Sequence, residues 1–407
     1  MPDNKVATTA EIRSHFPALE RIHNGYPVAY FDGPGGTQVP REVVDAVTDY
    51  LLHHNSNTHW SYPTSRETDQ IIADSRAALA NFLNAEPNEI VFGANMTTLA
   101  FHLARALGRG FKSGDEIIVT ELDHHGNRDP WRSLVQERGA VLRELPMNLE
   151  TGQLEIDELK GLINDRTRLI AIGGASNALG TVNDISRAAQ IARATGVLSF
   201  IDAVHYAPHV LVDVKEIGCD FLACSAYKFY GPHIGVLYGR TQLLAEIDFP
   251  KLIPAPNTAP DRVETGTQNH EGIAGAAAAV NFLASLASTG TRRERLAATF
   301  DVLHQRGQSL VTRLWNGLME IDGVKVYGPS PSHPRTPTVS FTKRGKTAQE
   351  MAIALAERGL FVSHGNFYAA MVVERLGKAD EGLVRIGCAC YTSEDEIERL
   401  LDAVRII

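Results

Sequence analysis

The sequence predicts an α/β fold, with a mainly parallel seven-stranded sheet in a large domain and a smaller α+β C-terminal domain. Two observations carry this prediction. Short apolar runs of strand length alternate with amphipathic stretches of helical length over roughly the first two thirds of the chain, a pattern typical of βα units and a parallel sheet. At 407 residues, the chain is also long enough for a large domain and a second, smaller one.

Each predicted strand of the large sheet is a short apolar run, and four of the seven precede a predicted helix. The strands are expected at 89–93, 115–120, 140–145, 168–172, 197–201, 220–224 and 235–238, and the helices near 97–108, 128–138, 155–164 and 184–195. Ligands of parallel sheets bind outside the carboxyl ends of the strands. Asp202 and the residues after Phe92, Thr120 and Ile172 occur at such ends, so we expect a ligand site there.

The composition changes at the proline-rich segment 250–257, which is predicted to be an exposed loop. After it, helices are expected near 271–288, 291–320, 347–358 and 393–404, with strands near 324–327, 336–341, 360–363 and 383–388. We therefore expect three parts. An N-terminal segment, 1–25, packs on the small domain; a large ligand-binding domain spans 26–270; and linking helices with the small C-terminal domain span 271–407.

Composition excludes several classes of protein. Hydrophobic residues make up 44% of the chain and charged residues 21%, as in an ordinary globular protein. A net charge of −9 without a dense Lys/Arg block argues against a nucleic-acid partner. No run approaches the roughly 18 consecutive apolar residues of a membrane span, and no metal is predicted. Four cysteines are too few for a disulfide framework, and the first residues lack the apolar core of a signal peptide, so a cytoplasmic location is expected.

Lys228 is the most informative residue of the chain. It follows the predicted strand 220–224 in the segment Ser225-Ala226-Tyr227-Lys228, and Asp202 ends the preceding strand. An acid and a Ser-x-x-Lys at two strand ends suit a pocket for pyridoxal 5′-phosphate (PLP). The lysine forms the Schiff base, the aspartate keeps the pyridine nitrogen protonated, and the serine contacts the phosphate. Taken alone, the tetrapeptide also fits a solvated lysine after a core strand.

Six further segments, in the same order and spacing, resemble the class V aminotransferase family of fold-type I PLP enzymes, and most closely its cysteine desulfurase branch. The resemblance extends from about residue 28 to residue 405. The segments are 28–36 (VAYFDGPGG), 95–98 (NMTT), 121–127 (ELDHHGN), 176–181 (SNALGT), 264–268 (ETGTQ) and the strand that contains Arg385.

The resemblance implies a role for each residue of a cofactor site. Met96, Thr97 and Ser225 would bind the phosphate, completed by Thr267 from a partner chain of a homodimer with shared active sites. Exposed N–H groups at a helix start favour such an anion. His124 would stack on the pyridine ring, while Asn177 and His205 would reach its O3′ oxygen. Lys228, His124 and Asp202 are the implied catalytic residues.

The resemblance also implies a substrate side. Arg385 lies where the family binds the carboxylate of an amino acid, and a guanidinium suits a planar carboxylate; a structural ion pair is the alternative. Trp60, in the segment 55–63, would narrow the pocket. Tyr368 takes the position at which desulfurases carry the catalytic loop cysteine, and no cysteine occurs between 225 and 387. The chain therefore combines the family's cofactor residues with a loop that lacks the sulfur-accepting thiol.

The expected function is PLP-dependent chemistry at Cα or Cβ of an amino acid, with Lys228 as the acid/base at Cα. β-Elimination and transamination rank equally, and Arg262 is a candidate second arginine for a transaminase. The alternatives are an isopenicillin-N-epimerase-like epimerase, a true cysteine desulfurase that uses another thiol such as Cys388 or Cys390, and a protein that binds PLP without catalysis.

Overall fold

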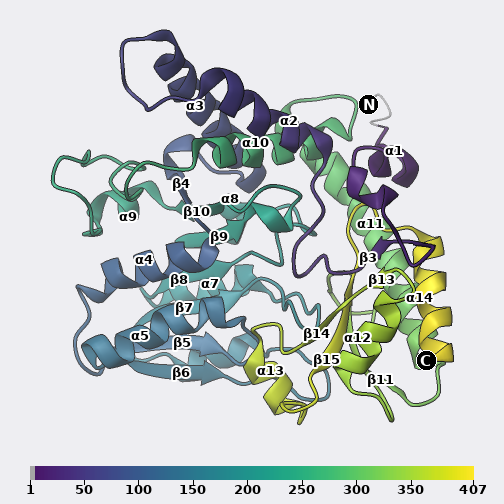
Figure 1. Cartoon of the computed structure of the whole chain (residues 1–407). Coiled ribbons are helices and arrows are strands. Elements are labelled where there is room, and N and C mark those ends of the chain that lie inside the picture. Colours follow the sequence, from purple (N-terminus) through teal and green to yellow (C-terminus); the bar gives the residue numbers. More distant parts are fainter. Residues whose placement is uncertain (1–4) are drawn as a thin grey trace.

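The computed structural model describes residues 5–407 and contains the two sheets that the sequence predicts (Figure 1). The large sheet has seven strands in the order β4-β10-β9-β8-β7-β5-β6. Its strands are β4 (Ile90–Gly93), β5 (Glu116–Thr120), β6 (Val141–Leu145), β7 (Thr167–Gly173), β8 (Leu198–Asp202), β9 (Phe221–Ser225) and β10 (Gly235–Gly239). The fold class predicted from the sequence is thus confirmed, and each predicted strand matches an observed one within two residues.

One strand of the large sheet runs against the others. β10 pairs antiparallel with both β4 and β9, whereas the pairings among β5, β6, β7, β8 and β9 are parallel. Residues 226–234 alone connect β9 to β10, which is too short for the crossover of a dozen or more residues that a parallel neighbour needs. The short connection carries Lys228, so the lysine is fixed between two neighbouring strands.

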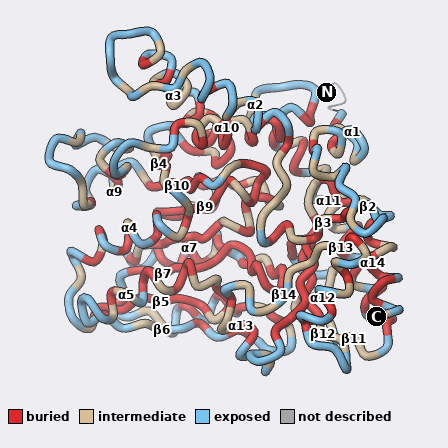
Figure 2. Tube along the Cα trace, viewed as in Figure 1, coloured by how far each residue is buried: buried red, intermediate tan, exposed pale blue. Residues whose placement is uncertain are grey.

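Both faces of the large sheet are buried, which explains its continuous apolar runs. Along β7, Leu169 and Ala171 belong to one core cluster while Ile170 and Ile172 belong to the other. Helices α4 (Met96–Gly108), α5 (Asp129–Arg138) and α9 (Thr241–Glu246) cover the first face. Helices α2 (Arg41–Asp49), α3 (Pro63–Leu83), α7 (Ile185–Ala194) and α10 (His270–Ser285) contribute to the second cluster. Figure 2 shows the strands buried and the covering segments exposed on their outer sides.

The smaller sheet has four strands in the order β11-β12-β15-β14, all antiparallel. They are β11 (Val324–Tyr327), β12 (Thr338–Lys343), β14 (Ser363–Gly365) and β15 (Leu383–Gly387). Helices α11 (Arg292–Met319), α12 (Ala348–Ala356) and α14 (Glu394–Ile406) enclose a separate core with this sheet. The short α13 (Ala370–Arg375) follows the loop after β14. The small sheet therefore has a core of its own, and the division at residues 25 and 270 stays a prediction.

Several elements differ from the sequence-based expectation. Helix α3 was not predicted, and its polar N-terminal half lacks a clear apolar stripe. The predicted helix at 155–164 is a short turn followed by α6 (Leu159–Leu162). The predicted strand at 360–363 is divided: β13 (Leu360–Phe361) pairs with β3 (Ala29–Tyr30), and β14 pairs with β15.

The N-terminal segment contacts both parts of the molecule. Residues 1–4 lie outside the described residues. Ile12, in α1 (Thr9–Arg13), and Phe16 belong to the core cluster of the large sheet, and Arg13 donates a 3.0 Å hydrogen bond to Glu396 of α14. The remaining short elements are β1 (Ile22–His23), β2 (Tyr26–Pro27) and α8 (Val214–Ile217). Among residues 5–407, no helix combines the length and apolar character needed to cross a bilayer.

Candidate active site

A cavity of about 320 Å³ opens at the carboxyl ends of β4, β5, β7, β8 and β9. The sequence placed the ligand site at these strand ends, and eight residues predicted to bind the cofactor line the cavity together: Met96, Thr97, His124, Asn177, Asp202, His205, Ser225 and Lys228. Of the other lining residues, Asp123, Tyr227 and His233 are polar but are not among the residues predicted to bind the cofactor.

Lys228 is buried directly beneath the turn that follows β3. Its Nζ donates a hydrogen bond to the carbonyl oxygen of Pro34, and the residue as a whole is only 8% exposed. Burial, followed by the nearby charge of Arg385, lowers the pKa of Lys228 to about 7. A large part of the lysine is therefore a neutral amine near neutral pH, which is the form that attacks a carbonyl or takes a proton.

Two buried carboxyl groups lie at the strand ends opposite the lysine. Asp202 accepts a 2.9 Å hydrogen bond from Val204 N–H, and burial raises its pKa to about 7, with a further contribution from the charge of Asp123. Asp123 accepts hydrogen bonds from the N–H groups of Gly173 (2.6 Å) and Thr120 (3.0 Å), and burial raises its pKa to about 6. A cation placed beside Asp202 would lower its pKa and offset the cost of burying the charge.

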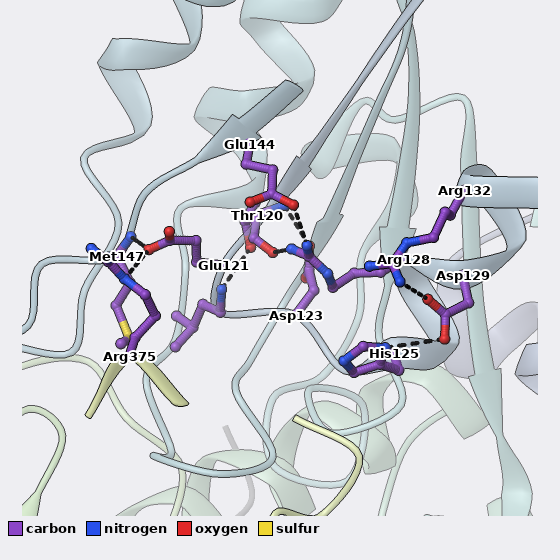
Figure 3. A network of polar contacts seen from close by, with 11 residues as sticks. Thr120, Glu121, Asp123, His125, Arg128, Asp129, Arg132, Glu144, Met147 and Arg375 are labelled. Atoms are coloured by element: carbon purple, nitrogen blue, oxygen red, sulfur yellow. Dashed lines mark hydrogen bonds and ion pairs between the residues drawn. The ribbon is translucent and has the colours of Figure 1, made fainter. Parts of the chain in front are cut away.

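Figure 3 shows a network of polar contacts that includes Asp123 and His125, the two sequence neighbours of His124. Arg128 donates hydrogen bonds to the carbonyl oxygen of Thr120 and to Glu144, and His125 contacts Asp129 at 3.0 Å. His124 Nδ1 accepts a 2.8 Å hydrogen bond from Gly126 N–H, so the proton of the neutral ring is on Nε2. Burial lowers the pKa of His124 to about 4, which keeps the ring neutral, as a flat stacking surface requires.

The start of α4 supplies hydrogen-bond donors at one end of the cavity. Met96 N–H donates to Ser225 Oγ at 2.9 Å, and Asn95 caps the helix through Thr98 N–H, also at 2.9 Å. The N–H of Thr97 makes no hydrogen bond to any described residue. Free N–H groups at a helix start bind anions, so this end of the cavity suits a phosphate.

Asn177 and His205 face the cavity from the loops after β7 and β8. Asn177 donates a 2.9 Å hydrogen bond to the carbonyl oxygen of Phe367, and its Oδ1 is buried without a partner among the described residues. His205 Nε2 lies 3.0 Å from Thr336 Oγ1 and 3.1 Å from Thr338 Oγ1. Burial lowers the pKa of His205 well below its ordinary value. Because these groups converge on one cavity, a ligand with several polar atoms would satisfy them.

Arg385 adjoins the cavity and contacts four residues through its guanidinium group. It donates 3.0 Å hydrogen bonds to Ser363 Oγ, to the carbonyl oxygen of Asn177 and to Asp32 Oδ1. Its guanidinium carbon also lies 4.2 Å from the centre of the Phe367 ring. Asp32 and Phe367 are not among the predicted site residues, because only the fold brings these distant segments to Arg385. Three of its five N–H groups are used, which leaves two for a carboxylate.

The loop at 366–368, where the resemblance predicts the thiol-bearing loop of a desulfurase, forms a hydrogen-bonded turn. Phe367 and Tyr368 both have left-handed backbone conformations, with φ of 57° and 55°. Residues other than glycine rarely adopt this conformation. Tyr368 N–H donates to Asn366 Oδ1 at 3.1 Å, and His125 N–H donates to the carbonyl oxygen of Tyr368 at 2.7 Å. The Tyr368 ring is exposed and lies 5.7 Å from that of His124. The turn thus fixes Tyr368 beside the mouth of the cavity.

The surroundings of the four cysteines disfavour a thiolate. Cys219, Cys224 and Cys388 are buried and Cys390 is partly buried, all as free thiols. Burial raises the pKa of Cys388 and of Cys390 to about 12, so neither is a thiolate at neutral pH. Neither lines the cavity of Lys228.

Three other predicted residues lie away from this cavity. Trp60 is 58% exposed on the loop before α3, and Thr267 lines a neighbouring hollow of about 440 Å³. The Arg262 guanidinium donates to the carbonyl oxygens of Ala245 and Ile247, which ties it to its own domain.

The residues present fit PLP. The buried amine of Lys228, the carboxylate of Asp202, the unpartnered Asn177 Oδ1 and the free N–H of Thr97 match the aldehyde, ring nitrogen, ring oxygen and phosphate of that cofactor. Fold and site together define a PLP-dependent enzyme of the α/β class. The family model "Aminotransferase class-V" matches residues 29–400, and the chain belongs to that family. Its members are PLP-dependent enzymes that act at Cα or Cβ of amino acids.

Relatives and solved structures agree over the whole chain. The chain is 33% identical to an aminotransferase-like protein, FGM3, of Gibberella zeae, with 97% of each chain covered. It is 32% identical to a cysteine desulfurase of Dickeya dadantii, with 96% and 94% covered. The apo cysteine desulfurase of Thermococcus onnurineus superposes with a TM-score of 0.89 at 28% identity, covering 100% of this chain and 99% of that one. The cysteine desulfurase CsdA of Escherichia coli gives 0.85 at 27% identity, with 98% of each covered.

Proposed function

We propose that this enzyme catalyses β-elimination on an L-amino acid that carries a leaving group at Cβ, releasing ammonia and a 2-oxo acid. The observation that carries the proposal is the combination of a complete cofactor cavity around Lys228 with the turn at 366–368, which has no thiol. An enzyme of this family without a sulfur acceptor retains the chemistry at Cα and Cβ.

Each residue contributes one physical effect to this reaction. PLP, when bound, supplies an electron sink for the bonds at Cα. Lys228 would hold PLP through its amine, and this amine, neutral near pH 7, is placed to remove the Cα proton of the substrate. Arg385 holds the substrate carboxylate and so orients Cα. Asp202 keeps the ring nitrogen protonated through its negative charge. The Cβ substituent leaves with the electron pair of its bond, and water completes the release of the oxo acid and ammonia.

Two observations favour elimination over the other reactions of the family. A transaminase must also bind an oxo-acid acceptor, and Arg262, the candidate second arginine, is bound to carbonyl oxygens of its own domain. A desulfurase needs a mobile thiolate, and the thiols of Cys388 and Cys390 are protonated and outside the cavity.

The test measures three products with purified enzyme and PLP. With β-chloro-L-alanine or an S-substituted L-cysteine, we expect equal amounts of ammonia and pyruvate without any added acceptor. Amino-group transfer to an added 2-oxo acid, with little free ammonia, would instead identify a transaminase. Alanine formed from L-cysteine together with a protein persulfide would identify a desulfurase.

We also propose that the active form is a homodimer with shared active sites. Thr267 does not line the cavity of its own chain, and exposed apolar side chains lie near the loop before α3 and the segment after α9: Leu51, Leu52, Trp60, Tyr62, Leu252 and Ile253. Mixing inactive Lys228→Ala and Thr267→Arg chains should restore up to a quarter of the activity if Thr267 acts across the interface. No recovery of activity would reject the sharing of active sites.

We also propose that the enzyme is located in the cytoplasm, where the four free cysteines would remain reduced. Fractionation of cells tests this location.

A further inference from the structure

His233 lines the cofactor cavity, although neither its sequence context nor any strand-end pattern drew attention to it. It lies between Lys228 and the first residue of β10. Its ring stacks nearly flat on that of Tyr227, with centres 4.9 Å apart and an angle of 17° between the planes. Its two ring nitrogens make no hydrogen bond to the described residues. A histidine that is held in place but has no polar partner is available to a ligand.

The backbone places His233 at the phosphate end of the cavity. Gly235, two residues further on, pairs with Gly93, and a side chain at Gly235 would lie within 2.5 Å of the Asn95 backbone. Ile234 accepts a 2.8 Å hydrogen bond from Ala226 N–H through its carbonyl oxygen. His233 is therefore next to the start of α4 on one side and next to the segment that contains Ser225 and Tyr227 on the other.

Charge at this end of the cavity is otherwise lacking. The cavity-lining residues that are able to carry positive charge are Lys228, His124, His205 and His233. Burial keeps His124 and His205 neutral, and Lys228 is committed to the covalent bond with the cofactor. Tyr227, which stands beside the lysine, has no positive charge to offer. A phosphate dianion at the start of α4 would thus have His233 as the cavity-lining imidazole that is free to donate a hydrogen bond to it.

We propose that His233 is a phosphate-binding residue of the PLP site, which donates a charge-assisted hydrogen bond to the cofactor phosphate while Tyr227 holds its ring in place. Thr97 N–H, Ser225 and His233 would then surround the phosphate from three segments of the chain. This inference rests on the cofactor of the family and does not depend on the β-elimination reaction.

The experiment compares two ligands that differ only in the phosphate. Apoenzyme of the wild type and of His233→Gln is titrated with PLP and with pyridoxal, and binding is followed by absorbance. Loss of a hydrogen bond to a charged group corresponds to about a 10- to 100-fold rise in Kd. We expect this rise for PLP and little change for pyridoxal, which has no phosphate. Catalytic turnover is not needed for the readout.

Two further variants make the result decisive. Tyr227→Phe keeps the ring that supports His233 and should leave the Kd of PLP within about twofold, whereas His233→Lys should recover part of the affinity lost in His233→Gln. His102→Gln, a histidine of the neighbouring hollow that does not line the cofactor cavity, is the matched control. Equal losses for PLP and pyridoxal, or an unchanged Kd for PLP in His233→Gln, would overturn the proposal.

Discussion

The cofactor half and the substrate half of the active site are built in different ways. The predicted cofactor half consists of residues at or just beyond the ends of neighbouring strands of one sheet, such as Asp202 at the end of β8 and Lys228 after β9. The substrate half is assembled around Arg385 from Asp32, Asn177, Ser363 and Phe367, which come from both domains. The cofactor half is therefore fixed by the sheet, and the substrate half depends on how the two domains pack.

This difference indicates where the chain is free to change its reaction. A change at a strand end disturbs the site that all reactions of the family share. We expect a change in the loop at 366–368, which does not line the cofactor cavity, to alter the reaction of the substrate and to leave the cofactor site intact. Tyr368 at the predicted position of the thiol would be a change of this second kind, and the following experiments separate the two halves.

Removal of Lys228 should have the largest effect. We expect Lys228→Ala to lower kcat by about 10²- to 10⁴-fold or more, because the general base and the covalent attachment are both lost. Borohydride reduction and peptide mapping of the wild type should place the pyridoxyl group on Lys228. Lys215→Ala, which removes a surface lysine paired with Glu86, is the control and should retain activity. A label on another lysine would reject the cavity as the site.

Arg385→Lys tests the substrate half. It keeps the positive charge but loses the planar guanidinium, which can make two parallel hydrogen bonds to a carboxylate. We expect kcat/KM to fall, with a loss of about 2–5 kcal/mol in transition-state stabilisation, while PLP remains bound. Asp32→Asn removes the charge that Arg385 contacts at 3.0 Å and should change KM more than kcat. Unchanged turnover in Arg385→Lys would mean that the arginine holds the two domains together and does not bind substrate.

Asp202→Asn and Asn177→Ala compare charge with neutral hydrogen bonding within the site. The aspartate would maintain the positive charge of the ring nitrogen. Its loss should therefore raise the activation free energy, measured through kcat, by more than the roughly 1.5–3 kcal/mol of a charged hydrogen bond. The asparagine contributes a neutral hydrogen bond of roughly 0.5–1.5 kcal/mol. Steady-state kinetics at saturating PLP measures both, and equal losses would remove the role assigned to Asp202.

Covalent capture of PLP by the apoenzyme should depend on pH. The pKa of Lys228 is lowered to about 7, and only the neutral amine attacks, so the rate should rise as the pH increases through 7. Between pH 6 and pH 8 we expect an increase of about tenfold, followed by a plateau. The ordinary lysine pKa would instead give a rate that keeps rising toward pH 10, which stopped-flow absorbance would detect.

The double variant Cys388→Ser/Cys390→Ser should have the smallest effect. Both thiols lie outside the cofactor cavity with their pKa raised to about 12, so kcat/KM for β-elimination should change less than twofold. A thermal melt should accompany the assay because Cys388 is buried in the core of the small domain. Loss of activity without loss of stability would show that a strand thiol takes part in the reaction.

The sequence by itself determined the α/β fold and most of the cofactor half. Strands that are buried on both faces can be predicted from short continuous apolar runs. Because the carboxyl ends of parallel strands meet at one edge of a sheet, the sequence predicts that Asp202, Asn177 and Lys228 lie together. Helix α3 was not predicted, because its apolar stripe is indistinct. The antiparallel direction of β10 was not predicted either, because the direction of a strand depends on the strands with which it pairs and not on its own sequence.

Only the tertiary structure decided the surroundings of Arg385 and the position of His233. Asp32 and Arg385 are separated by 353 positions in the chain yet lie 3.0 Å apart, and His233 reaches the cavity because β10 pairs with β4 beside the start of α4. Such contacts arise from the packing of domains and strands, which acts between distant segments. Local composition and spacing determine the secondary-structure propensity of each segment. They do not determine which distant segment it will contact.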